Sequence, residues 1–188
     1  MPACAPAVVG IAQNFNASQT LPPDWTMPTF PWEFNRPNTT GGTGNAAYAD
    51  AIGGTNTREL VTPVFSTLGT SAVLLTFRTD LYIYSGQTQL QEAMVDISTN
   101  GGATWSTVWD KTAAYKGAVA VDLSQWAANQ PNVMVRFRVI LPYGGSYWQL
   151  DDVVVGAMPT PATPTNLSVT LSGVSDALLA WNGSGGSK

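Results

Sequence analysis

The side chains of this sequence best able to do chemistry are its carboxylates, because histidine is absent from all 188 residues. Ser-His-Asp and Cys-His catalysis are therefore excluded, as are zinc, iron or copper sites with histidine ligands. Carboxylates leave two possibilities, which are hard-cation binding through oxygen atoms and the paired acids of a glycosidase. The adjacent residues Asp151 and Asp152, in an apolar segment near the end of the chain, stand out among them.

A glycosidase needs two carboxylates that face each other, about 5 to 5.5 Å apart for retention and farther apart for inversion. Glu92 and Asp96 share one face of an expected strand, but four residues along a strand separate them by about 13 Å. The other glutamates are Glu33 and Glu59, and their pairing across strands stays open at this stage. We therefore expect no enzyme, and a carboxylate-dependent glycoside hydrolase is the least favoured alternative.

Aromatic rings are the second group that could bind a ligand, because a pyranose has an apolar face that stacks on an exposed ring. The chain has seven tryptophans. The segment Tyr143-Gly-Gly-Ser-Tyr147 is expected to expose two phenols on a glycine-rich loop. The candidate ligand-binding residues are Tyr143, Tyr147, Trp148 and Trp126. For any single tryptophan the alternative is a core position, which is the more frequent one.

The composition predicts a surface that is poor in charge. Only 11% of the residues are charged and the net charge is −4, where about 25% charged residues is usual. A surface of Thr, Ser, Asn, Gln and Gly suits sugars better than ionic partners. An acidic chain without a basic run has no electrostatic footprint for nucleic acid, and no apolar segment approaches the ~20 residues that span a bilayer. The single cysteine excludes an internal disulfide.

Strands must position these side chains, because short alternating apolar runs recur from Ala46 onward with turn residues between them. A single short helix is expected over 123–129, with Ser124 as its N-cap. This spacing predicts an all-β fold made of two antiparallel sheets packed as a sandwich. The expected strands are 46–52, 58–65, 72–84, 91–98, 105–109, 118–123, 133–141 and 148–155.

The flanking segments predict a larger parent protein. Residues 13–46 are expected to form a long loop pinned to the sandwich by buried rings of Trp25, Phe30, Trp32 and Phe34. Alternate prolines near residue 160 indicate a stiff linker. The expected organisation is a linker that leads into the first strand (1–12), the sandwich domain (13–157), a Pro/Thr linker (158–165), and a truncated start of another module or an edge hairpin (166–188).

The order of segments resembles the MAM-like jelly rolls of bacterial secreted proteins, namely the cleaved-adhesin and choice-of-anchor domains. The resemblance covers about residues 13–157, from Leu-Pro-Pro-Asp-Trp at 21–25 to Trp-Gln-Leu-Asp-Asp-Val at 148–153. The tail is similar to the opening of a fibronectin type III module. The resemblance implies a jelly-roll-type β-sandwich, a secreted or cell-surface location, and a role in adhesion, glycan binding or support of a neighbouring domain.

The resemblance also implies structural calcium near the final Asp-Asp strand. Adjacent strand residues point to opposite faces, so one aspartate could face the interior, where an unpaired charge is costly. Calcium with oxygen ligands would satisfy that aspartate. The alternative is a buried aspartate that accepts hydrogen bonds from backbone N–H groups or an arginine. The expected ligands are Asp50, Asp151, Asp152 and Asn16, although many relatives have an acidic residue where this chain has Asn16.

These features predict a non-catalytic extracellular binding or adhesion module whose favoured ligand is carbohydrate. The expected partners are a glycan or an extracellular protein and the neighbouring domains of the same polypeptide, without nucleic acid or membrane insertion. The alternative is a structural spacer or a subunit of an extracellular assembly. An exposed aromatic patch would favour the first function, and large apolar interfaces would favour the second.

Overall fold

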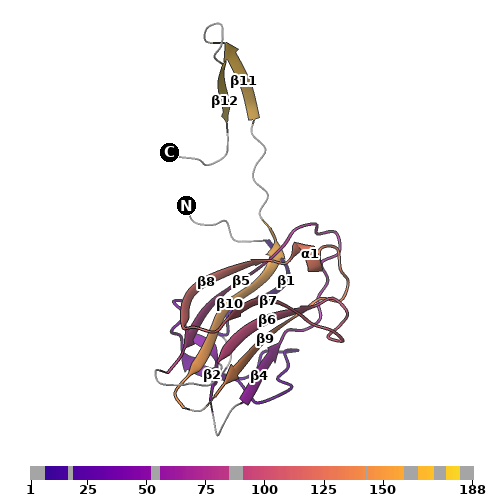
Figure 1. Cartoon of the computed structure of the whole chain (residues 1–188). Coiled ribbons are helices and arrows are strands. Elements are labelled where there is room, and N and C mark those ends of the chain that lie inside the picture. Colours follow the sequence, from indigo (N-terminus) through magenta and orange to yellow (C-terminus); the bar gives the residue numbers. More distant parts are fainter. Residues whose placement is uncertain are drawn as a thin grey trace. The chain divides into compact units, whose positions relative to one another are not determined.

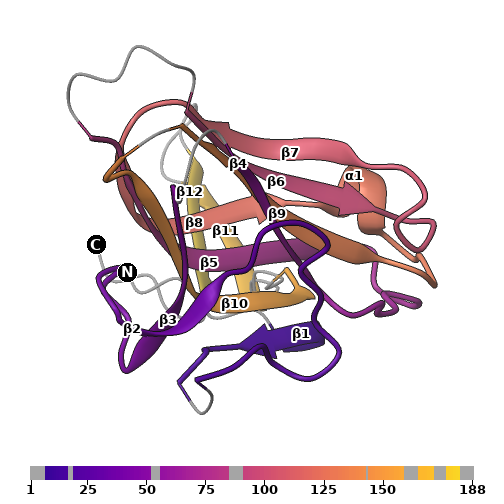
Figure 2. The ribbon, with the colours of Figure 1, turned by 90° about the horizontal axis from the view of Figure 1, so that it is seen from below.

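The structure is a computed structural model that describes residues 7–16, 19–51, 56–84, 91–142, 144–158, 165–171 and 177–182. The chain divides into two units after Met158. The first unit is a sandwich of two antiparallel sheets, and Figure 1 and Figure 2 show the sheets as two layers. The expected all-β architecture is therefore present.

The larger sheet carries most of the candidate site residues. Its β10 pairs with β5 along one edge; along the other edge, β3 pairs with residues 147–150 and β1 with residues 153–157. Asp151 and Asp152 thus lie where β10 changes partner. In spatial order the sheet contains β2 (Glu33–Pro37), β3 (Asn45–Asp50), β10 (Tyr147–Ala157), β5 (Val73–Tyr82) and β8 (Tyr115–Asp122), with β1 (Ala7–Gln13) also on β10.

The smaller sheet packs against it. Its strands, in spatial order, are β4 (Asn56–Val61), β9 (Met134–Leu141), β6 (Glu92–Ser98) and β7 (Ser106–Lys111). Alternation decides which side chains enter the core: Val135, Phe137 and Val139 of β9 are fully buried, while the residues between them face outward. Phe137 packs against Phe77 of β5, with ring centroids 5.5 Å apart. Burying one such side chain contributes about 1.5 to 3 kcal/mol.

The N-terminal segments differ from expectation. Residues 7–12 were expected to be linker, but they belong to β1, which pairs with β10. The expected long loop contains β2, which pairs with β3. Trp25, Trp32 and Phe34 are buried as predicted, whereas Phe30 is 52% exposed.

The short helix is confirmed in place but not in its cap. α1 (Ser124–Ala127) begins at Ser124, and its capping residue Leu123 makes no side-chain hydrogen bond to the helix. Ser124 Oγ instead accepts a hydrogen bond from the Val73 N–H at 3.0 Å, and the Asp122 carboxylate accepts one from the Ser124 N–H at 2.9 Å. The serine therefore ties the helix to β5.

The second unit contains a described hairpin of β11 (Thr165–Leu171) and β12 (Ala177–Asn182), which pair antiparallel. Two strands alone are marginal in water. Among the described residues, no helix is long and apolar enough to cross a bilayer.

Candidate functional site

The first candidate site is the bulge of β10 at Asp151 and Asp152. The pairing of β10 with β5 shifts register between Asp151 and Val154, and Asp152 has a φ of +49°. Bulges re-aim side chains and often lie beside functional sites, and a left-handed φ is uncommon outside glycine. The local backbone is therefore specialised where the two carboxylates lie.

Asp151 does not face the space between the sheets. It follows the core residue Leu150, so alternation turns its side chain to the outer face of the sheet with Tyr147 and Gln149. Asp151 is nevertheless 0% exposed. The β2–β3 connection covers it so closely that a Cβ at Gly42 would overlap the Asp151 Oδ2 atom. The burial that the sequence predicted for one aspartate is real, but a loop causes it.

The Asp151 carboxylate is only half satisfied. Its Oδ2 accepts a hydrogen bond from Asn38 Nδ2, and Asn38 Oδ1 accepts hydrogen bonds from the N–H and hydroxyl of Thr40 at 2.8 Å each, which fixes the amide orientation. Within the described part of the chain, Asp151 Oδ1 is buried without a hydrogen-bond partner. Burial raises the pKa of Asp151 to about 6. A buried acceptor without a donor is a natural position for a cation or a proton.

The other predicted metal ligands lie at different distances from Asp151. The Asp152 side chain is about half-buried, and its Oδ2 atom lies 3.3 Å from Arg78 Nε. Asn16 reaches the same β2–β3 connection, where its Nδ2 lies 3.4 Å from Thr43 Oγ1. A surface pocket of about 360 Å³ adjoins Asp152 and is lined by Ala12, Gln13, Asn14, Asp152 and Val154.

Asp50 is not brought to this pair. It lies opposite Tyr147 in the register of β3 and β10, four residues from Asp151, or about 13 Å along the strand. Its carboxylate accepts a hydrogen bond from Arg58 Nη2 at 3.2 Å. Within the described residues, no three acidic or cysteine side chains converge on one point. A cation at the bulge would therefore need amide and carbonyl oxygens as well.

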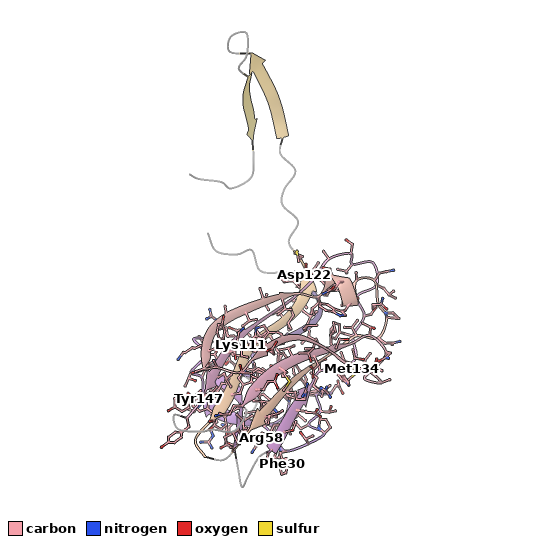
Figure 3. All side chains as sticks on the ribbon, in the orientation of Figure 1. Phe30, Arg58, Lys111, Asp122, Met134 and Tyr147 are labelled. Atoms are coloured by element: carbon pink, nitrogen blue, oxygen red, sulfur yellow. The ribbon has the colours of Figure 1, made fainter. Side chains whose placement is uncertain are left out.

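The second candidate site is a stack of tyrosines on the outer face of the larger sheet, here called the tyrosine ladder (Tyr48, Tyr147 and Tyr82). The Tyr147 ring lies between Tyr48, at 5.5 Å and 30°, and Tyr82, at 5.2 Å and 18°. Tyr82 is 43% exposed. Figure 3 places Tyr147 at the periphery of the sandwich. The ladder joins three strands and presents aromatic surface to solvent.

Polar groups border the ladder on both sides. The Arg36 guanidinium lies 4.9 Å from the centre of the Tyr48 ring, and Lys116 Nζ lies 3.4 Å from Asp80 Oδ2. Burial, reinforced by nearby Asp50, raises the pKa of Tyr48, and burial with nearby Asp80 raises that of Tyr147. Both phenols therefore keep their protons at neutral pH and can donate hydrogen bonds.

Of the ligand-binding residues predicted from the sequence, the structure places one on the tyrosine ladder and two against or within the core. Tyr147 is the middle ring of the ladder. Trp148 cannot be a platform, because it is fully buried and donates from Nε1 to Thr79 Oγ1 at 2.6 Å. Trp126 is half-buried and packs against the core. Tyr143 lies outside the described residues. The sequence analysis missed Tyr48 and Tyr82. The only signal for them in the sequence is that each occupies an outward-facing position in its strand.

The third cluster is a set of ion pairs on the outer face of the smaller sheet. Asp96 is 1% exposed and lies 2.8 Å from Arg136 Nη2 and 2.9 Å from Arg138 Nε. Arg136 also pairs with Glu59 at 3.0 Å and covers the Trp105 ring at 4.5 Å. Burial alone would raise the pKa of Asp96, but hydrogen bonds from Arg138, Thr107 and Arg136 outweigh it and lower that pKa.

Comparison with known proteins finds similar folds among solved structures. No family model and no curated protein sequence matches the chain. The K1 cleaved adhesin domain of Lys-gingipain from Porphyromonas gingivalis is 18% identical with a TM-score of 0.59, over 79% of this chain and 98% of that domain. The carbohydrate-binding module TmCBM61, solved with β-1,4-galactotriose, is 10% identical with a TM-score of 0.55, over 77% and 94%.

A third similar structure is the CBM22-1 xylan-binding domain of Paenibacillus barcinonensis Xyn10C. It is 9% identical with a TM-score of 0.50, over 84% of this chain and 99% of that domain. At such identities the likeness shows a shared fold. The predicted jelly-roll-type antiparallel β-sandwich is thus confirmed.

Proposed function

We propose that this protein is a non-catalytic, extracellular carbohydrate-binding or adhesion module, and that the tyrosine ladder is its ligand-binding surface. The observation that carries the proposal is the exposed stack of three tyrosines on one sheet face. Sugars combine apolar C–H faces with many hydroxyl groups, so they suit rings bordered by polar side chains. Two proteins of similar fold are described as binding β-1,4-galactotriose and xylan.

Three of the described carboxylates, Asp96, Asp151 and Asp152, argue against glycoside hydrolysis. A glycosidase acid must hold a proton near neutral pH. Asp96 is poorly suited, since its arginine partners lower its pKa. Asp151 has a raised pKa, but it is covered completely by the β2–β3 connection, and its neighbour Asp152 is paired with Arg78. Neither acid is presented to a substrate with a free carboxylate opposite.

Replacing Tyr147 with alanine is expected to weaken glycan binding at least 10-fold, because the ring supports both of its neighbours in the ladder. Stacking on an aromatic ring contributes about 0.5 to 1.5 kcal/mol beyond the area it buries. Calorimetric titration with β-1,4-galactotriose and with xylo-oligosaccharides measures the loss. Phe30→Ala is the matched control, because Phe30 is an exposed ring outside the ladder. Equal binding by both variants would place the ligand elsewhere.

We also propose that calcium binds at the β10 bulge and stabilises the fold. The fit rests on Asp151 Oδ1, which is buried without a hydrogen-bond partner among the described residues. Asp151 and Asp152 would hold the ion, with Asn16 and carbonyls of the β2–β3 connection as neutral donors. Calcium supplies positive charge there and joins β10 to that connection. Asp50 is omitted because it lies opposite Tyr147, about 13 Å along the strand from Asp151.

Calcium is expected to raise the melting temperature of the wild-type protein, and EGTA is expected to reverse the rise. An ion that binds only the folded state adds about 2.7 kcal/mol at a hundred-fold excess over its dissociation constant. Thermal melts at pH 7 measure the shift. Asp152→Asn should reduce the response, whereas Asp110→Asn, at an exposed position of β7, should keep it. An unchanged wild-type melting temperature would remove calcium from the proposal.

The proposed domain organisation follows the sheets. The binding module begins with β1, a linker follows it near residue 160, and the hairpin of β11 and β12 opens a following module. The alternative function, a structural spacer or an assembly subunit, would leave the ladder without a sugar ligand, and an assembly subunit would also self-associate. Sugar titration tests the first point, and analytical ultracentrifugation tests the second.

A further inference from the structure

We propose that the tyrosine ladder recognises the end of a neutral sugar chain, by stacking one terminal pyranose on the free face of Tyr82. This inference rests on the proposed carbohydrate-binding function and adds the class of ligand. It follows from which ring faces of the ladder are open, how the rings stand on the sheet, and what borders the open face.

Among the residues that the structure describes, only one ring face of the ladder is open. Both faces of Tyr147 are covered by its neighbours, and one face of Tyr48 is covered by Tyr147. The Arg36 guanidinium covers Tyr48 and is itself fixed by Glu33, with Nε and Oε2 2.6 Å apart. Tyr82 has Tyr147 on one side only, and among the described residues no other ring or cation stacks on it. The stack is therefore capped at one end and open at the other.

The rings stand upright on the sheet. Tyr82 and Tyr147 lie opposite each other on β5 and β10, with ring centroids 5.2 Å apart and 18° between the ring planes. This spacing is close to the ~4.8 Å between neighbouring strands, so the ring planes run along the strands and face across them. A sugar stacked on Tyr82 must stand on edge in the same way, beside Tyr82 on the β8 side. The ladder offers no flat platform along which several sugars could lie.

An ion pair closes one side of this position. Asp80 precedes Tyr82 by two residues on the same face of β5, about 7 Å away. Lys116 lies opposite Asp80 on β8 and bonds it at 3.4 Å, and Thr39 Oγ1 donates to the same carboxylate at 2.7 Å. Lys116, whose side chain is 57% exposed, can donate to a sugar hydroxyl, while Asp80 is 7% exposed and holds the lysine in place. The lysine side chain also blocks the sugar chain in that direction, so the sugar that it contacts is the last one.

The charges around the ladder are balanced. Lys116 is paired with Asp80 at the open end, and Arg36 is paired with Glu33 at the capped end. A uronic or sialic acid would need a cation free of a carboxylate partner. The balanced pairs instead match the hydroxyl groups of a neutral pyranose.

Calorimetric titration with galactose, β-1,4-galactotriose, xylose and xylotriose tests the inference. We expect the monosaccharide and trisaccharide of the preferred series to bind within 3-fold of each other. Tyr82→Ala should lower the sugar affinity at least 10-fold, and Tyr48→Ala should lower it less than 3-fold. Tyr82→Phe should bind the sugar like the wild type. Circular dichroism verifies that each variant is folded.

Affinity that rises more than 10-fold from monosaccharide to trisaccharide would overturn chain-end recognition, as would equal losses in Tyr48→Ala and Tyr82→Ala. Either result would leave the carbohydrate-binding function standing, with the ligand lying along the ladder. If the wild type binds none of these sugars and no polymer of either series, both the inference and the proposed function fail.

Discussion

In calcium-free buffer, raising the pH from 4 to 7 is expected to destabilise the wild-type protein, relative to Asp151→Asn, by up to about 3 kcal/mol. Asp151 has a folded-state pKa of about 6, above its ordinary value of 3.8. Between these values the folded state holds a proton that the unfolded state has lost, so stability falls as the pH rises. The effect is complete above pH 6 and absent below pH 4. Asparagine cannot titrate and lacks this dependence.

Urea denaturation at several pH values measures the difference. A constant difference in the free energy of unfolding between the two proteins reflects the buried amide of the variant. Only the change of that difference with pH is caused by titration of the carboxylate. Asp110→Asn should follow the wild type throughout, because Asp110 is exposed. Calcium at pH 7 should remove the wild-type penalty, since the ion then replaces the proton. Parallel curves for wild type and Asp151→Asn would show that the carboxylate is hydrated in the folded state.

The fold was predictable because alternation encodes which face of a strand is buried. Val135, Phe137 and Val139 of β9 face the core as their spacing predicts. β2 was not predicted because Glu33–Pro37 has a single buried residue and ends in proline. Its pairing with β3, and not an alternating pattern in its own sequence, makes it a strand. β1 escaped because a register shift between Val8 and Ile11 breaks its alternation.

The carboxylate site was predictable in part. The adjacency of Asp151 and Asp152 indicated that one of them is buried, but the sequence does not show that a glycine-containing loop buries it from outside. Gly42 permits this approach because any larger residue would overlap the carboxylate. The position of Asp50 depends on the register between β3 and β10, which are far apart in the chain. Such register is set by tertiary packing.

The tyrosine ladder depends on three strands and could not be found from one of them. The glycine-rich segment before β10 suggested that both Tyr147 and Trp148 are exposed, yet neighbours in a strand face opposite ways. One of the two must be inside, and the larger apolar ring is the one that the core accepts. Tyr48 and Tyr82 then become functional candidates only through their pairing with Tyr147.

Replacing Asp96 with alanine is expected to lower the free energy of unfolding by about 3 kcal/mol at pH 7. This is the lower end of the range for breaking a buried ion pair. The aspartate is buried and accepts hydrogen bonds from Arg136, Arg138 and Thr107. Its loss leaves two half-buried guanidinium groups without their shared partner. Because the folded-state pKa of Asp96 is lowered, its contribution is present above pH 4 and is lost as the pH falls through the folded-state pKa.

Chemical denaturation of Asp96→Ala, with Asp110→Ala as the exposed control, measures this cost. Arg138→Met combined with Asp96→Ala should cost less than the sum of the two single changes, because groups in one network are not additive. An Asp96→Ala cost equal to that of the control would mean that water replaces the ion pairs without loss. The cluster lies on the smaller sheet and the tyrosine ladder on the larger one. The folded Asp96→Ala variant should therefore keep its sugar affinity, which separates the stabilising cluster from the binding surface.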